Sequence, residues 1–176
     1  LQENTKWGKN LRILKVPGIE NYGKIMEYEA RSVSGGILYQ TKDNITLSFA
    51  DFKYPTIKPT FEQQMDLIFA FKVCKYVKSN AIVFAKNEST VGIGAGQMSR
   101  VDSSYIAIRK AKDKIKGAVM ASDAFFPFKD ALEIAIDAGV TAVIQPGGSV
   151  NDDEIIEFAK SRNIPMILTG IRHFRH

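Results

Sequence analysis

The stretch 78–100 (KSNAIVFAKNESTVGIGAGQMSR) constrains the fold more than any other part of the chain. Its apolar run 81–85 predicts a buried strand, and residues 90–93 predict a second strand after a short polar turn. The glycines of GIGAG permit a positive φ and a close approach of ligand to backbone. The N–H groups that open the following helix would face an anion. The pattern predicts a site for a small phosphorylated ligand, with Asn80 and Arg100 at its two ends.

The same glycines leave alternatives open. Gln97 follows GIGAG, so the sequence lacks the third glycine of the dinucleotide-binding GxGxxG pattern, and no acidic residue ends a second Rossmann strand. No Walker GK[ST] sequence is present. A tight turn that needs small residues explains the glycines equally well.

From residue 60 onward, short apolar runs alternate with helical patterns. This alternation predicts a layered α/β/α sandwich with a parallel or mixed sheet covered on both faces. Two helix starts have capping-box sequences, Thr60 with Gln63 and Asn151 with Glu154. The expected elements are strands at 11–16, 119–121, 141–144 and 164–168, a hairpin over 27–40, and helices over 60–77, 99–114, 127–139 and from 151.

Composition restricts the function classes. The chain of 176 residues is 45% hydrophobic and 24% charged, as expected of one globular domain. Its net charge of +5 is diffuse except at 110–116, so a nucleic-acid-binding stripe is not favoured, and the diffuse positive field suits anionic small molecules equally well. The single cysteine, Cys74, is consistent with a reducing cytoplasm. Its place in an apolar helical pattern predicts a buried residue of the hydrophobic core. No apolar run approaches the roughly 20 residues of a membrane-spanning helix. Because the chain opens with Leu1, we expect the natural protein to begin further upstream, as for a fragment or a processed chain.

The sequence SDAFFPF at 122–128 follows a predicted strand. Its phenylalanines predict an aromatic wall that stacks on a heterocycle, although each could equally fill the core. Asp123 and Asp130 flank this wall. Either carboxylate could orient an amine or bind a cation, and either could simply favour a helix N-terminus.

Two further loops carry candidate chemistry. The turn QPGGS at 145–149 has N–H groups that could hold a carboxylate or a pteridine edge, or it is an ordinary glycine turn. The only histidines, His173 and His176, lie beside Arg172 in a tail that is either a source of acid–base catalysis or a frayed basic end. One cysteine and two tail histidines lack zinc-ligand spacing, and no GxSxG elbow of a serine hydrolase occurs.

Several segments together resemble one family. They are VKSNAIVFAK, VGIGAGQMSRVDS, MASDAFFPFKDALEIA, GVTAVIQPGGS and RHFRH, in that order. The chain is similar to the carboxy-terminal part of the bifunctional AICAR transformylase/IMP cyclohydrolase family of purine biosynthesis. The similarity is specific over 61–176 and weaker from 11 through SGGILYQ.

The resemblance implies a fold and an activity. The family's transformylase part consists of two α/β halves with a cytidine-deaminase-like fold that lacks zinc, and this chain resembles the second half. Residues 1–59 would be a lead-in and 60–176 the carboxy-terminal α/β subdomain. The implied reaction transfers a formyl group from 10-formyltetrahydrofolate to the 5-amino group of AICAR, and a separate amino-terminal domain closes the ring to IMP. The implied protein is a cytoplasmic homodimer with composite sites, without nucleic-acid or membrane partners.

The resemblance also implies residue roles. Asn80 is the catalytic amide at the AICAR carboxamide, Arg100 and Arg172 contact the nucleotide, and Phe125 lies against the base. Asp123 lies near a structural potassium ion in some members of the family. The positions that match the folate side are Val101, Asp130, Ser149 and Val150.

One departure from the family pattern stands out. The family's Lys-His motif, whose histidine is the leading general-base candidate, has no match here. We therefore expect this chain to carry about half of an active site and to be inactive alone. A non-catalytic nucleotide-binding module, which needs no base, is the alternative, and a Rossmann-type oxidoreductase is a weaker one.

Overall fold

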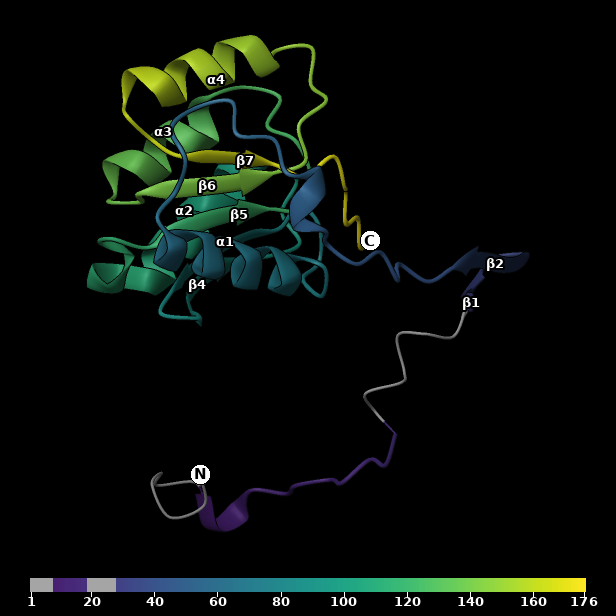
Figure 1. Cartoon of the computed structure of the whole chain (residues 1–176). Helices are drawn as coiled ribbons and strands as arrows, with labels where there is room; N and C mark the ends of the chain where they lie inside the picture. The colour runs from purple at the N-terminus through teal and green to yellow at the C-terminus, as the bar shows by residue number, and fades with distance from the viewer. Residues whose placement is uncertain (1–7, 19–27) are drawn as a thin grey trace. The chain divides into compact units, whose positions relative to one another are not determined.

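The computed structural model describes residues 8–18 and 28–176, and the chain divides into two compact units, 1–46 and 47–176 (Figure 1). The expected boundary between residues 59 and 60 falls inside the second unit, because residues 47–59 pack with the elements that follow them.

Unit 1 contains a short 3-10 helix, η1 (Gly8–Asn10), and an antiparallel hairpin of β1 (Tyr28–Val33) and β2 (Gly36–Thr41). The hairpin confirms the expectation for 27–40, although Glu27 lies outside the described residues. The strand expected at 11–16 is wrong, because these residues form no regular element and leave side chains such as Leu14 exposed (84%). A strand needs a hydrogen-bonded neighbour, and the described part of unit 1 pairs only β1 with β2.

Unit 2 is built around one five-stranded mixed sheet, with strand order β4-β3-β5-β6-β7. Strands β5, β6 and β7 are parallel, and β3 is antiparallel to both β4 and β5. This confirms the expected α/β class with a mixed sheet. The elements are η3 (Phe49–Asp51), α1 (Phe61–Cys74), β3 (Ile82–Lys86), β4 (Ser89–Gly94), α2 (Arg100–Ala111), η4 (Lys112–Ile115), β5 (Val119–Ser122), α3 (Asp130–Asp137), β6 (Ala142–Gln145), α4 (Asp152–Ser161) and β7 (Met166–Leu168).

Strand side chains alternate between two cores, as the period of two requires. In β3, Phe84 joins the core beneath α2, α3 and α4, whereas Val83 joins the core beneath α1. Met120 and Val119 of β5 divide in the same way. The sheet is therefore the middle of three layers (Figure 1).

Helix α1 begins as its sequence predicts. Thr60 accepts from the N–H of Gln63, and the Gln63 side chain accepts from the N–H of Thr60, which completes the capping box. The second expected capping box is wrong. Asn151 precedes α4 but makes no capping hydrogen bond, because its side chain donates instead to the carbonyl of Pro127 at 2.7 Å.

Two glycines of β4 bring α2 against the sheet. A Cβ at Gly92 would lie 2.3 Å from the Ala107 carbonyl oxygen, and one at Gly94 would lie 1.9 Å from the Ser103 carbonyl oxygen. These distances are far below van der Waals contact, so only glycine permits the helix to approach this closely. The expected tight turn is wrong for these two glycines, because both lie in β4 and neither has a positive φ. Of the three glycines in GIGAG, Gly96 is the one with a positive φ, of 67°.

Residues 47–59 cover the outer edge of β7. Lys53 and Leu168 exchange backbone hydrogen bonds of 3.0 and 2.9 Å. The Thr56 hydroxyl donates to the Ile164 carbonyl and accepts from the Met166 N–H. Phe52 is buried in the core beneath α1. This segment belongs structurally to the sheet.

The β4–α2 contact predicts the effect of enlarging its glycine. Gly94→Ala should reduce the free energy of unfolding by about 2–3 kcal/mol or more, because the new methyl group forces α2 away from β4. Gly36→Ala is the matched control, since a Cβ there meets no atom within 4 Å. Denaturant unfolding followed by circular dichroism measures both variants, and equal stabilities would contradict this account of the glycine.

Candidate functional site at the carboxyl ends of the parallel strands

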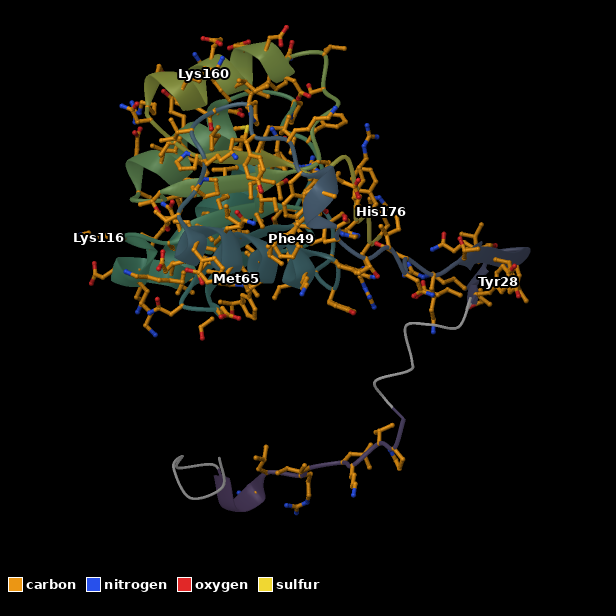
Figure 2. The ribbon with its side chains drawn as sticks, viewed as in Figure 1. Tyr28, Phe49, Met65, Lys116, Lys160 and His176 are labelled. Carbon is orange, nitrogen blue, oxygen red and sulfur yellow. The ribbon has the colours of Figure 1, made fainter. Side chains whose placement is uncertain are left out.

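The candidate site lies at one edge of the sheet. The carboxyl ends of β5, β6 and β7 meet there, and the start of β3 joins them because Ile82 pairs with Ser122 across antiparallel strands. The arrowheads of these parallel strands point toward the end of unit 2 where the chain terminates (Figure 1). Such edges are where α/β sheets bind ligands. Figure 2 shows His176 at this end of the unit and Lys116 at the opposite end.

A buried carboxylate, that of Asp123, lies at the centre of this edge. The side chain is fully buried, directly after β5. Its Oδ1 accepts from the Arg100 guanidinium at 3.1 Å, and its Oδ2 accepts from the Ser79 hydroxyl at 2.5 Å. Arg100 also donates through Nε to the Ser122 hydroxyl at 3.2 Å. The charge of Asp123 is therefore paired and hydrogen-bonded, as burial requires.

The tail at 171–176 is attached beside this carboxylate, through the Asp123 backbone and through Ser79. The His173 N–H donates to the Asp123 carbonyl at 2.9 Å. Ser79 and Arg175 pair through their backbones at 2.8 Å, and the Arg175 N–H donates to the Ser79 hydroxyl at 3.0 Å. The interpretation of this tail as a frayed basic end is therefore wrong.

The two histidines of the tail differ in their exposure to solvent. His173 is 3% exposed, and its ring packs against Phe71 at 5.0 Å. The ring is thus enclosed by the core beneath α1 and cannot meet a substrate at the surface. His176 is exposed and stacks on Phe174 at 5.5 Å.

A cation–aromatic pair faces outward from the edge. The Arg172 guanidinium lies over the Phe125 ring, 4.9 Å from Cζ to the ring centroid. Arg172 is exposed and Phe125 is half-buried, so both remain accessible to a ligand. The other phenylalanines of SDAFFPF differ: Phe126 is a fully buried core residue, and Phe128 is 63% exposed. The predicted aromatic wall therefore loses Phe126, and Phe125 is the member that contacts an arginine.

Asn80 lies at the start of β3, beside the loop that follows β4. Its side-chain amide donates to the Gln97 carbonyl at 3.0 Å, and its backbone carbonyl accepts from the Ser103 hydroxyl at 2.6 Å. These contacts fix the Asn80 side chain. Among the described residues none donates to its Oδ1, which is available to accept from a ligand amide.

The start of α2 is capped by its own residues. The Ser99 hydroxyl accepts from the Asp102 N–H at 3.0 Å and donates to the Asp102 carboxylate at 2.8 Å. An acidic side chain thus lies in the first turn, where an anion would have to bind. The geometry does not support the expected anion site at this helix.

In the loop after β6, two backbone N–H groups are also occupied by a side chain of the loop's own helix. The N–H groups of Gly148 and Ser149 donate to the two oxygens of Asp152, at 2.6 and 3.2 Å. They are not free to hold a carboxylate or a pteridine edge, so the ordinary-turn interpretation is correct for these two groups. A Cβ on Gly148 would lie 3.5 Å from the Arg172 guanidinium, which brings this loop beside the cation–aromatic pair.

The four residues expected on the folate side have different surroundings. Val101 packs against the core beneath α2. Asp130 opens α3 and accepts from the Ala131 N–H at 2.8 Å, as a carboxylate at a helix start does. Ser149 is half-buried and Val150 is 99% exposed. Asn151, donating to Pro127, joins their loop to the loop of Phe125.

Sequence reasoning missed three residues that shape the edge: Ser79, Gln97 and Asp152. Ser79 directly precedes Asn80, a predicted site residue, and this adjacency could have indicated Ser79. For Asp152, an acidic residue shortly after a glycine turn was the signal, since carboxylates readily bind exposed turn N–H groups. Gln97 acts through its backbone carbonyl, which no side-chain pattern can indicate.

Within residues 8–18 and 28–176, no group of three or more His, Cys, Asp or Glu side chains is arranged to hold a metal ion. In the same residues, no helix has the length and apolar character needed to cross a membrane.

The fold and the edge define an α/β protein with an ordered cluster of polar side chains at the ends of its parallel strands. The family model described as AICARFT/IMPCHase bienzyme matches residues 2–110. The chain therefore belongs to the AICARFT/IMPCHase bienzyme family.

Relatives extend the similarity over nearly the whole chain. Proteins named "Bifunctional purine biosynthesis protein PurH" from Parvibaculum lavamentivorans and Bartonella bacilliformis are 52% and 50% identical over 179 residues. The protein of that name from Chelativorans sp. is 52% identical over 178 residues. Each comparison covers 96% of this chain and 33% of the relative, so the chain spans about a third of the length of these relatives.

Among solved structures, a form of RibD from Acinetobacter baumannii is partly similar, with a TM-score of 0.43 and 16% identity. The similarity covers 61% of this chain and 35% of that one.

The position of Cys74 yields a prediction. The thiol is fully buried in the core beneath α1. Burial raises the pKa of the Cys74 thiol well above its usual range, and the negative charge of Asp123 raises it further. We expect a thiol reagent at mildly alkaline pH to label the folded chain about a hundredfold more slowly than the unfolded chain. Labelling of the folded chain at the rate of a free thiol would contradict this packing.

Proposed function

We propose that this chain forms part of an AICAR formyltransferase. The reaction transfers the formyl group of 10-formyltetrahydrofolate to the 5-amino group of AICAR, and the whole protein is also an IMP cyclohydrolase of purine biosynthesis. Family membership supports the proposal, as do the names of the relatives. The observation that carries the proposal is the Arg172–Phe125 pair, which lies at the same edge of the sheet as Asn80. This pair offers a cation and an aromatic ring to a planar, phosphorylated ligand.

The chemistry sets three demands on the site. The 5-amine of AICAR is a weak nucleophile, because its lone pair is delocalised into the ring and the carboxamide. The site must hold the amine against the formyl carbon, accept its proton and stabilise a tetrahedral oxyanion. Positioning therefore contributes much of the rate, and it depends on rigid side chains.

The described residues divide these tasks. Asn80, fixed by Gln97 and Ser103, would bind the carboxamide through its available oxygen. The Phe125 ring would stack on the imidazole, and the Arg172 guanidinium would contact the nucleotide bidentately. Val101, Asp130, Ser149 and Val150 stay proposals for the folate side.

Arg100 has a different role in this proposal. Its guanidinium already donates to Asp123 and Ser122, and its side chain is 12% exposed. Binding a phosphate would require Arg100 to share donors with a buried carboxylate. We assign Arg100 to fixing Asp123, with any nucleotide contact made through its remaining donors.

The potassium ion that the resemblance implies would be held near Asp123. Each carboxylate oxygen of Asp123 accepts one hydrogen bond, from Ser79 or from Arg100, and keeps a further lone pair that could face a cation. The proposed reaction has no step that passes through potassium or zinc. Cytoplasmic location and a homodimer with composite sites remain part of the proposal.

None of the described residues is assigned as the general base. His173 is enclosed by the core, and the Lys-His motif has no match in the sequence. We propose that the base comes from the part of the relatives' length that this chain does not span. On this basis the chain binds AICAR without turning it over.

Isothermal titration with AICAR tests the binding half of the proposal. Arg172→Ala should weaken AICAR affinity about tenfold or more, because it removes a charge-assisted contact and the ring pair. Arg162→Ala is the matched control: Arg162 is also exposed, and it pairs with Asp137 on the helical surface away from this edge. Equal affinities of the wild type and Arg172→Ala would contradict the assigned role.

Formation of tetrahydrofolate from 10-formyltetrahydrofolate and AICAR tests the catalytic half. We expect no turnover by the chain alone, and turnover after the remaining length of a relative is added. Asn80→Ala should then reduce the rate about a hundredfold. Binding of AICAR with no turnover even in the completed protein would favour a non-catalytic nucleotide-binding module.

A further inference from the structure

The Ser79 hydroxyl connects the tail at 171–176 to the buried carboxylate of Asp123. It donates to Asp123 Oδ2 at 2.5 Å and accepts from the Arg175 N–H at 3.0 Å. The Ser79 N–H also donates to the Arg175 carbonyl at 2.8 Å. One small side chain thus joins the start of β3, the end of β5 and the tail.

Arg172 lies between the attachments of this tail. Ahead of it, the Ile171 N–H donates to the Thr169 hydroxyl at 3.2 Å. After it, the His173 N–H donates to the Asp123 carbonyl at 2.9 Å, and Arg175 is held by Ser79. The backbone on both sides of Arg172 is therefore fixed.

This fixation matters because Arg172 itself is exposed. A long exposed arginine side chain samples many rotamers, and holding it in one costs entropy. Its backbone position is what keeps Cζ within 4.9 Å of the Phe125 centroid. A hydrogen bond to a carboxylate is among the stronger kinds, so the Ser79–Asp123 contact can hold the tail in place.

We propose that Ser79 is a positioning residue. Its hydroxyl holds the tail against Asp123 so that Arg172 presents its guanidinium beside Phe125. The role in nucleotide binding rests on the proposed function, whereas the attachment of the tail does not. Ser79 itself touches no substrate.

Amide hydrogen exchange tests the attachment without any ligand. In Ser79→Ala, the His173 N–H should exchange about tenfold faster than in the wild type, although its own acceptor, the Asp123 carbonyl, is unchanged. The Val143 N–H, which donates to the Pro165 carbonyl, reports global stability and should be unaffected. Unchanged His173 protection would overturn the proposal.

Three further variants sharpen this experiment. Ser79→Thr keeps the hydroxyl and should retain wild-type His173 protection, whereas Ser79→Cys keeps the size but weakens the hydrogen bond and should lose part of it. Ser161→Ala is the matched control, because the Ser161 hydroxyl makes a local helix contact to Phe158. Ser79→Ala could also speed the exchange of the Val143 N–H, and the Ser79→Thr and Ser79→Cys variants then test the proposal. Equal protection of the His173 N–H in these two variants would overturn it.

A double-mutant cycle on AICAR affinity tests the link to Arg172. Ser79→Ala should weaken binding several-fold alone and add no further loss in the Arg172→Ala background, because both act through one guanidinium. Additive losses would overturn the positioning role. A wild-type chain that does not bind AICAR would contradict the proposed function, while the exchange of His173 would still decide whether Ser79 holds the tail.

Discussion

The buried charge of Asp123 is the constraint on which the functional edge depends. A carboxylate without solvent must be paired, and removal of one partner from such a pair costs about 3–5 kcal/mol. Its partners come from the start of α2 and from the residues before β3, and its own carbonyl holds the tail. Three chain segments far apart in sequence therefore have to meet in one arrangement. The positions of the exposed side chains at this edge therefore depend on how the buried Asp123 carboxylate is paired.

The edge also shows how buried and accessible positions divide between adjacent residues. Phe126 fills the core while Phe125 stays accessible, because successive residues leaving β5 point in different directions. Glycines 92 and 94 serve helix packing rather than phosphate binding. The N–H groups of Gly148 and Ser149 are occupied by the local carboxylate of Asp152. Arg172 and Phe125, by contrast, stay accessible at this edge.

The sequence predicted the α/β class, the mixed sheet, the hairpin of unit 1 and the capping box at Thr60, since these follow from local periodicity and composition. It could not predict the pairing of Asp123 with Arg100 and Ser79, because that contact depends on strand order. The strand expected at 11–16 shows the converse limit: an apolar run has β propensity, but a strand forms only where another strand pairs with it. The roles assigned to the site residues stay predictions.

The segment 47–59 has a consequence for how the sheet behaves outside its natural context. Through Lys53 and Thr56 it occupies the backbone groups along the outer edge of β7. An uncovered strand edge is a template for pairing with another chain, and natural proteins shield such edges. A truncated version that began at residue 60 would keep every strand of the sheet but uncover β7, so it would tend to aggregate edge to edge. Solubility of this α/β unit therefore depends on residues that contribute no strand to the five-stranded sheet.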